Sequence, residues 1–402
     1  MTDVLAGARI LVADDQPDAA RTFCSALKSA GARIQNAVDG QAAHDTIRSQ
    51  PFDLLLVDMK MPPDEWGGLW LLEQLAGTRT RIPTLVLSGE GGKAQVIKAM
   101  RLGASDWVDK DSAANQLHPA CVKLLTEADA AALQNAAENL PTPLAYRFAR
   151  YLRTTTTETQ VSEGLHAVEA ILRFAACVGM ATSTPNPIPG LTMNKLYRPS
   201  MGTWRDIAFA LGRQPNTEKT AKRIIQALAP DTPTRTTIND LVKLRNDIFH
   251  GRATPKTADR DIIDTLLRRF AHRATTNFPL GLAVATSMRY DGTIYTLDTL
   301  LLRGTAAPQP ATHHADHPIV NGTVILLQDT THPSDLGPML ASTTSSSGVV
   351  RCVQFDGILD ATDATGSPVV KYGRSHDGDD ELPSLPSSAW PAASEWMVSD
   401  GR

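Results

Sequence analysis

Short apolar segments alternate with helix-forming segments over the first 125 residues, and this alternation restricts the fold more than any other feature of the chain. In the intervening segments, apolar residues recur three and four positions apart, which is the spacing of one helix face. The segments expected to be strands are 8–14, 32–38, 52–58, 84–89 and 105–110. Strands that alternate with helices form a parallel sheet covered on both faces. The sequence therefore predicts a doubly wound α/β domain over residues 1–125.

Polar side chains stand where four of these strands end. Asp14 and Asp15 close the first strand, and Asp58, Ser88 and Lys110 close three others. The carboxyl ends of parallel strands share one edge of the sheet, so these groups should converge there. Three carboxylates so placed would repel one another unless a divalent cation joined them, and ligation by oxygen alone suits Mg²⁺. A lysine and a hydroxyl beside them would neutralise and hydrogen-bond an incoming phosphoryl group.

This arrangement resembles the receiver domain of two-component response regulators, a flavodoxin-like fold, and the resemblance covers residues 7–125. It is carried by the polar strand ends, by Met61-Pro62 after Asp58, and by the segments IPTLVLSG and GASDWVDK. Two features depart from the usual pattern of that family. Asp111 follows the lysine where a proline is common, and the segment PPDEWGG is longer than the usual loop.

The resemblance to receiver domains implies a role for each strand-end residue. Asp58 would accept a phosphoryl group from a sensor histidine kinase in a phosphorelay. The Mg²⁺ ligands would be Asp14, Asp15, Asp58 and the carbonyl oxygen of Lys60. Ser88 and Lys110 would hold the phosphoryl group, and Trp107 would be the aromatic residue that switches position.

From Val161 the pattern changes to long amphipathic helices, and the sequence predicts an all-helical domain over residues 161–278. One apolar stripe consists of Val161, Leu165, Val168, Leu172, Ala175 and Val178. Residues 126–160 are Ala-rich and polar and are interrupted by Pro141 and Pro143. They are therefore expected to form a helical connector with a break.

The segment LVKLRNDIFHGR, residues 241–252, allows two interpretations. In the structural one, Thr236 and Thr237 cap the start of a helix, Gly251 ends it, and Arg and His near the C-terminus are stabilised by the helix dipole. In the functional one, His250 exchanges a proton while Arg245 stabilises the charge of a phosphate undergoing attack by a ribose 2′-hydroxyl. Such chemistry needs no metal and selects RNA over DNA.

Arg245, the polar Asn246 and His250 also resemble the R-x4-6-H motif of the HEPN superfamily, whose helical bundles dimerise and often act as metal-independent ribonucleases. The resemblance implies that Arg245 and His250 are catalytic, that Asn246 orients them across a homodimer interface, and that RNA is the substrate. No cofactor is expected for this domain. The alternative is a non-enzymatic signalling adaptor whose helical domain dimerises or binds a nucleotide or a protein. A DNA-binding transcription factor ranks third, because no helix-turn-helix with a basic recognition helix stands out.

After residue 278 the apolar period shifts to two, which predicts a small, mainly β module over residues 279–375. Asp291-Gly292 lies between two such segments and predicts a hairpin turn. Residues 376–402 are polar, acidic and rich in Pro and Ser, so a flexible tail is expected.

Composition and charge limit the cellular setting. The chain has no apolar run of about 18 residues and its start lacks the pattern of a signal peptide, so a cytoplasmic protein without a membrane partner is expected. The four cysteines are widely spaced and indicate neither a zinc site nor a disulfide framework. Residues 150–275 contain 19 Lys and Arg against 11 Asp and Glu, a local charge of +8 in a chain of net charge −4. This balance favours a phosphate-rich partner and equally fits solvated helix faces.

Overall fold

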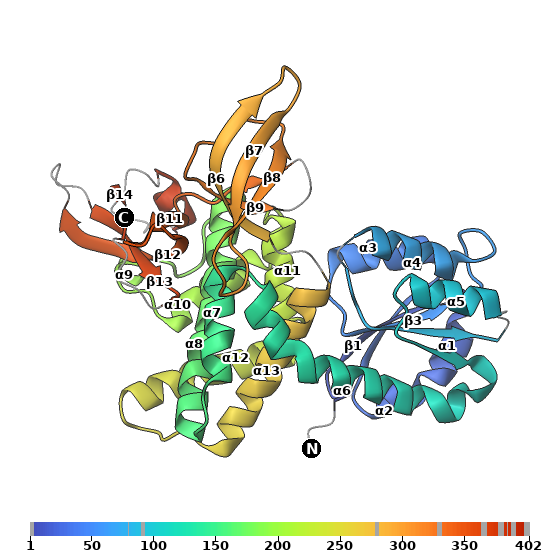
Figure 1. Cartoon of the computed structure of the whole chain (residues 1–402). Helices are drawn as coiled ribbons and strands as arrows, with labels where there is room; N and C mark the ends of the chain where they lie inside the picture. Colours follow the sequence, from blue (N-terminus) through green and yellow to red (C-terminus); the bar gives the residue numbers. More distant parts are fainter. Residues whose placement is uncertain are drawn as a thin grey trace. The chain divides into compact units, whose positions relative to one another are not determined.

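The protein is described by a computed structural model that covers residues 4–78, 80–89, 93–277, 281–327, 332–362, 368–376, 382–383, 385–386 and 391–397 (Figure 1). The chain divides into two compact units. The first consists of Met1–Leu133 together with Arg268–Pro279, and the second of Gln134–Leu267 together with Leu280–Arg402. Residues 268–279, expected to close the helical domain, therefore belong to the first unit.

The first unit contains the predicted parallel sheet of five strands, in the order β2-β1-β3-β4-β5. The strands are β1 (Arg9–Ala13), β2 (Arg33–Ala37), β3 (Leu54–Asp58), β4 (Thr84–Ser88) and β5 (Asp106–Asp109). The order reverses beside β1, where crossover connections leave on opposite faces. Loops at the carboxyl ends of β1 and β3 therefore border the crevice that such sheets use for binding.

Helices cover both faces of this sheet, because alternate residues of its strands are apolar on both sides. Ile10 and Val12 join one core, and Leu11 and Ala13 join the other. The helices of the first unit are α1 (Pro17–Phe23), α2 (Ser25–Ser29), α3 (Gly40–Ser49), α4 (Gly67–Gly77), α5 (Lys93–Arg101) and the start of α6 (Ala113–Asn139). A short 3₁₀ turn, η1 (Lys110–Ser112), joins β5 to α6.

The end of helix α13 (Thr257–Thr276) is built into the first unit by a buried ion pair. Nε and a terminal nitrogen of Arg273 donate to the two carboxylate oxygens of Asp53, at 2.8 and 2.7 Å. Asp53 is 0% exposed and directly precedes β3, and it also accepts from the backbone N–H of Arg9 at 2.7 Å. Burial would raise the pKa of Asp53, but the charges of Arg273 and Arg269 outweigh burial and lower it. The carboxylate is therefore ionised and fully paired.

Asn277 extends this attachment to the backbone. Its side chain accepts from the N–H of Phe52 at 2.5 Å and donates to the carbonyl oxygen of the same residue at 2.7 Å. His272 donates to the carbonyl oxygen of Asp53 at 2.9 Å. All these groups are buried, so removal of residues 268–277 would leave the backbone groups of Phe52 and Asp53 without these hydrogen-bond partners.

The second unit is helical around α8 (Thr157–Thr182), and this agrees with the predicted helical region. Its other helices are α7 (Thr142–Leu152), α9 (Met193–Tyr197), α10 (Met201–Leu211), α11 (Lys219–Leu228), α12 (Thr232–Phe249) and the start of α13. Helix α8 is long and apolar enough to cross a membrane, but 78% of its apolar window is buried. It packs against α7, α10 and α11, as the core helix of a bundle does.

Two antiparallel sheets follow in the second unit, as the alternating pattern predicts. One has the order β10-β9-β6-β7-β8 and the other β11-β12-β13-β14. The strands are β6 (Gly281–Tyr290), β7 (Tyr295–Leu301), β8 (Gln309–Ala315), β9 (Val324–Leu327), β10 (Ser334–Asp335), β11 (Leu340–Thr344), β12 (Val350–Thr362), β13 (Pro368–Arg374) and β14 (Leu385–Pro386). The hairpin at Asp291-Gly292 is confirmed: β6 pairs with β7, and Gly292 has the positive φ of 99° that the turn requires.

Three local expectations need correction. The expected connector is not separate, because α6 runs unbroken to Asn139 and α7 is a packed helix; the predicted break at Pro141 does occur. Helix α12 starts at Thr232 and is capped by Asp231, not by Thr236 or Thr237. The expected flexible tail is packed where it is described, because Trp396 in η3 (Pro391–Trp396) is fully buried and its carbonyl accepts from the N–H of Ile188.

Replacing Arg273 with Met should destabilise the protein by about 3–5 kcal/mol, because it leaves the Asp53 charge buried without its partner. The measurement is the free energy of unfolding in denaturant. Arg260→Met is the matched control, because Arg260 lies on the same helix and pairs with Asp261 at the surface; it should change stability little. The folded-state pKa of Asp53 is lowered, so the pair contributes its full stability above the unfolded pKa of aspartate, about 4. The difference between Arg273→Met and wild type should therefore shrink progressively as pH falls below about 4 toward the folded-state pKa. Equal stability of the Arg273→Met and Arg260→Met variants would contradict the structural role of the pair.

Candidate functional site

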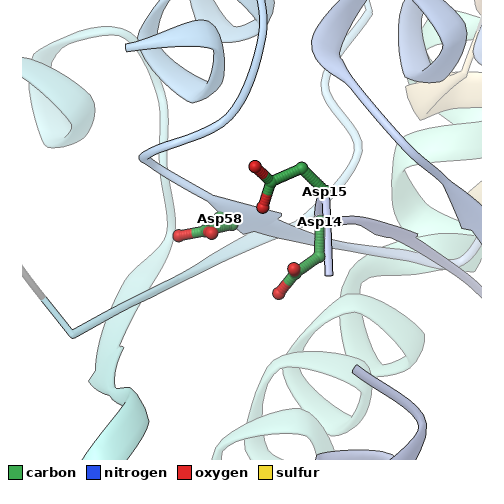
Figure 2. A group of neighbouring side chains, drawn as sticks. All are labelled: Asp14, Asp15 and Asp58. Atoms are coloured by element: carbon green, nitrogen blue, oxygen red, sulfur yellow. The ribbon is translucent and has the colours of Figure 1, made fainter. Parts of the chain in front are cut away.

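Three aspartates meet at the carboxyl edge of the parallel sheet, as the sequence predicts. Asp14 and Asp15 follow β1, and Asp58 is the last residue of β3 (Figure 2). One oxygen from each carboxylate lies within 4.8 Å of the others. Asp14 and Asp58 are buried and Asp15 is exposed, so the group opens to solvent on one side.

Lys110 provides the positive charge of this group. Its Nζ lies 2.8 Å from Oδ2 of Asp58 and 3.1 Å from Oδ2 of Asp14. Burial alone would lower the pKa of Lys110, but the hydrogen bonds and charges of Asp58 and Asp14 raise it. The lysine is therefore a stable cation that bridges the two buried carboxylates. The predicted convergence of Asp14, Asp15, Asp58 and Lys110 is confirmed.

Asp58 is 4% exposed, and its environment favours the protonated form more than that of an exposed aspartate does. Burial raises its pKa, the hydrogen bond and charge of Lys110 oppose that effect, and the Asp14 carboxylate adds to it. The backbone N–H of Lys60 donates to Oδ1 at 3.3 Å. Lys60 thus contacts Asp58 through its N–H; ligation by its carbonyl oxygen stays a prediction.

The loop after β3 brings backbone unusually close to Asp58. A Cβ on Gly68, the second residue of α4, would lie 2.3 Å from the carbonyl oxygen of Asp58. A Cβ on Gly67 would lie 2.2 Å from the carbonyl oxygen of Met61. Only glycine fits at either place, so the GG pair of PPDEWGG fixes the start of α4 against the acceptor strand. The sequence signal for this close approach is the GG pair itself, but the length of the segment PPDEWGG indicates only a long loop.

The donor set fits Mg²⁺. The candidate ligands are all oxygen atoms, and three carboxylates crowd against a single ammonium group. A hard divalent cation relieves such repulsion and prefers oxygen ligands. The N–H of Gln16 donates to Oδ1 of Asp14 at 2.8 Å, which orients this carboxylate. Gln16 was not singled out from the sequence, because a backbone donor leaves no trace in residue type.

Ser88 and Trp107 have the strand positions expected of them. Ser88 ends β4 and pairs with Asp109 of β5; its side chain lies outside the described part of the chain. Trp107 lies in β5 and is half-buried against an apolar cluster that includes Met59, Leu69 and Val86. Its movement on phosphorylation stays a prediction.

The candidate residues of the helical domain, Arg245, Asn246 and His250, do not share contacts with one another's side chains among the described interactions. Arg245 forms an ion pair with Glu169 of α8 at 3.2 Å, and Asn246 accepts through its carbonyl oxygen from the N–H of His250. His250 is the exposed C-cap of α12, and the left-handed Gly251, with φ of 68°, follows it as predicted. The structure thus gives Arg245 and His250 different neighbours. The residues that sequence reasoning missed are those around Arg245, beginning with Glu169.

Comparison with known proteins finds a match in the first unit. Residues 10–121 match the family described as response regulator receiver domain. Response regulator GtcR of Aneurinibacillus migulanus is 33% identical over 101 residues, which is 25% of this chain and 40% of that protein. Regulator of RpoS of Escherichia coli is 34% identical over 106 residues, 26% of this chain and 31% of that protein. The chain thus spans less than half the length of either relative. A solved receiver domain of a Francisella response regulator superposes over 30% of this chain and 98% of its own, at 24% identity and a TM-score of 0.28.

Mg²⁺ should bind saturably to the wild-type protein in a calorimetric titration. Asp14→Asn removes one of the buried oxygen ligands and should weaken binding at least as much as loss of an outer-shell partner, which costs on the order of 10- to 100-fold. Asp18→Asn is the matched control, because Asp18 lies on α1, is exposed and pairs with Arg21. Equal Mg²⁺ affinity of the Asp14→Asn and Asp18→Asn variants would exclude Asp14 as a ligand.

Proposed function

We propose that the response regulator receiver domain formed by residues 10–121 accepts a phosphoryl group on Asp58 and thereby acts in two-component signalling. The observation that carries the proposal is the position of Lys110, which bridges Asp58 and Asp14 within a group of three carboxylates. A cation and a divalent-metal site on either side of one buried carboxylate suit the transfer of a phosphoryl group.

The transfer itself needs little from the protein beyond position and charge. A carboxylate oxygen of Asp58 attacks the phosphorus of the donor, the new O–P bond forms, and the bond from phosphorus to the donor breaks as the donor leaves with its electron pair. Lys110 neutralises a phosphoryl oxygen, and the Ser88 hydroxyl donates a hydrogen bond to another. The carboxylates of Asp14, Asp15 and Asp58 and the carbonyl oxygen of Lys60 would hold Mg²⁺, which would supply charge neutralisation there.

The partner that fits this chemistry is a sensor histidine kinase, whose phosphohistidine would be the donor. Such a partner would meet the receiver domain in the cytoplasm. The exposed Asp15 lies on the open side of the carboxylate group, where a donor could enter.

For the helical domain we retain two hypotheses. The first is that a homodimer cleaves RNA without a metal, with Arg245 and His250 catalytic and Asn246 orienting them. The second is an adaptor that dimerises or binds a nucleotide or a protein without catalysis. The exposure of Phe249, 80%, directly beside the exposed His250 favours a contact surface at this helix end, which both hypotheses require.

Asp58→Asn should abolish labelling by a small-molecule phosphodonor such as acetyl phosphate in the presence of Mg²⁺, because the amide is a poor nucleophile. The readout is the mass of the intact protein together with phosphate-affinity electrophoresis. Asp64→Asn is the matched control: Asp64 lies in the same loop, is exposed, and has a φ of 59° that asparagine tolerates. A wild-type protein that stays unlabelled under conditions that label a known receiver would refute the proposal.

RNA incubated with the wild-type protein and EDTA should be cleaved and DNA should not, if the ribonuclease hypothesis holds. His250→Ala should then slow cleavage by about 10²- to 10⁴-fold, the usual contribution of an acid–base group. Arg245→Ala should also slow it, with Arg245→Lys as the variant that keeps the charge and the pairing with Glu169. Persistence of cleavage in both alanine variants, or its absence from wild type with and without a phosphodonor, would leave the adaptor hypothesis.

A further inference from the structure

Helix α8 carries one polar stripe on an otherwise apolar helix. Glu163, His166 and Glu169 recur at three-residue intervals, so they lie on one side of the helix. Most other residues of α8 are buried in the apolar core of the second unit. A run of three ionisable side chains on a core helix needs partners, and the neighbouring helices supply them.

Arginines from two helices approach this stripe. Arg150 of α7 lies 3.0 Å from Oε1 of Glu163, and Arg245 of α12 lies 3.2 Å from Oε2 of Glu169. His166 lies between the two glutamates in sequence, and its Nδ1 is 3.9 Å from Oε2 of Glu163. Each glutamate thus pairs with one arginine, while Oε2 of Glu163 is buried with no hydrogen-bond partner among the described residues.

Arg147 is a third arginine near this stripe, and it forms no ion pair with the two glutamates in the described part of the chain. It is half-buried on α7, and its Nε is buried with no hydrogen-bond partner among the described residues. Burial lowers its pKa, and the charge of Arg150 lowers it further, in spite of Glu163. Donors of a guanidinium that are withdrawn from water without an acceptor are costly, so a bound anion would relieve the cost.

Arg173, one turn further along α8, does not contribute to this group of charges. It donates to the carbonyl oxygens of Phe355 and Gln354 at 2.8 and 2.7 Å, and it pairs with Asp356 at 3.1 Å. Its guanidinium group is therefore occupied by contacts with β12. Of the three remaining guanidinium groups, those of Arg150 and Arg245 each pair with a glutamate of the stripe, and that of Arg147 pairs with neither glutamate in the described part of the chain.

His166 adds a neutral donor or acceptor that solvent can reach. Its side chain is 47% exposed. Burial lowers its pKa; Glu163 and Glu169 oppose that effect, while Arg147 and Arg245 add to it. The imidazole therefore favours its neutral form more than an exposed histidine does, and it lies within electrostatic range of both arginines.

We infer that Arg147, His166 and Arg245 form a binding site for a phosphate group on the face of α8 between α7 and α12. The phosphate is favoured over a carboxylate because the donors come from three helices. A planar carboxylate satisfies one guanidinium fork, whereas the tetrahedral oxygens of a phosphate can meet several donors at once. Glu163 and Glu169 hold Arg150 and Arg245 in position and prevent the site from accumulating excess charge.

This site differs from the pair expected from sequence. It joins Arg245 to His166 in place of His250, and it adds Arg147. It requires neither phosphorylation of Asp58 nor cleavage of RNA, so it can be tested apart from both. The phosphate group could belong to free inorganic phosphate, to a nucleotide or to an RNA strand.

The first test is calorimetric titration of the full chain, in EDTA and at low salt, with inorganic phosphate and with a short oligoribonucleotide that lacks a terminal phosphate. EDTA leaves the three receiver carboxylates without a divalent cation, and with Lys110 as their one cation in this group they disfavour phosphate. Arg147→Met and Arg245→Met should each weaken binding about tenfold or more, as loss of a charged hydrogen-bond donor does. Arg153→Met is the matched control. Arg153 is the exposed C-cap residue of α7, the helix that carries Arg147, and its loss changes the net charge equally.

The second test distinguishes a ligand contact from a structural role. A bound phosphate stabilises the imidazolium, so the pKa of His166 should rise on addition of the ligand that binds. The pKa is followed by NMR, with His166→Gln to assign the signal and Arg245→Lys to confirm that pairing and fold persist. In Arg147→Met the rise should be lost.

Each result decides the inference. Binding of inorganic phosphate, of the oligoribonucleotide or of both, weakened in Arg147→Met and Arg245→Met but not in Arg153→Met, supports the site and names the source of the phosphate. Absence of saturable binding of either probe to wild type overturns it. So does equal affinity of all three variants, or a His166 pKa that does not respond to the bound ligand.

Discussion

The buried pair of Asp53 and Arg273 is the interaction on which the first unit depends. Asp53 is fully buried at the start of β3, and every residue of β3 is buried as well. A lone carboxylate there would cost several kcal/mol of solvation free energy. Arg273 meets both of its oxygens, and Arg9 and His272 add hydrogen bonds on the carboxylate and the carbonyl. The receiver domain of this chain therefore includes a segment that follows it by well over a hundred residues, and residues 1–125 alone leave Asp53 without its cation.

Strand β3 thus carries a buried aspartate at each end, and the two differ in what surrounds them. The carboxylate of Asp53 is paired with the guanidinium group of Arg273, and the pKa of Asp53 is lowered. Asp58 shares one ammonium with Asp14, whose own charge opposes ionisation, and its pKa is raised. The first carboxylate has its lone pairs occupied by donors and serves stability. The second keeps oxygen atoms available for a metal ion or a phosphorus atom, which is the condition for a nucleophile. Residue type and strand are the same, so the difference comes from the number of donors and from the neighbouring charge.

The sequence predicted the receiver site well because parallel strands carry it. Once β1, β3 and β5 are placed, Asp14, Asp58 and Lys110 must converge, whatever the loops do. Contacts between distant helices have no such rule. Arg273 reads as one basic residue of an amphipathic helix, and nothing in its local pattern indicates a partner 220 residues earlier. Arg245 and His250 are five residues apart in sequence, but the first pairs with Glu169 of α8 and the second caps the exposed end of α12, and neither contact can be read from the spacing. Trp396 lies in a polar segment whose composition predicts a flexible tail, yet its side chain is fully buried and its carbonyl oxygen accepts from the N–H of Ile188, a contact that composition does not indicate.

The two candidate sites use opposite charge for related chemistry. The receiver site is acidic, because three carboxylates face one lysine. In the proposed function, an anionic phosphoryl group would approach when a divalent cation offsets the carboxylates, and it would then be held by a covalent bond. The proposed site on α8 presents the N–H donors of Arg147 and Arg245, so it suits reversible binding of a phosphate without a metal. This division follows the charge along the chain, in which residues 150–275 carry +8 while the chain as a whole carries −4. Chelation of divalent cations should therefore separate the two activities, because it removes the condition for the first and leaves every donor of the second in place.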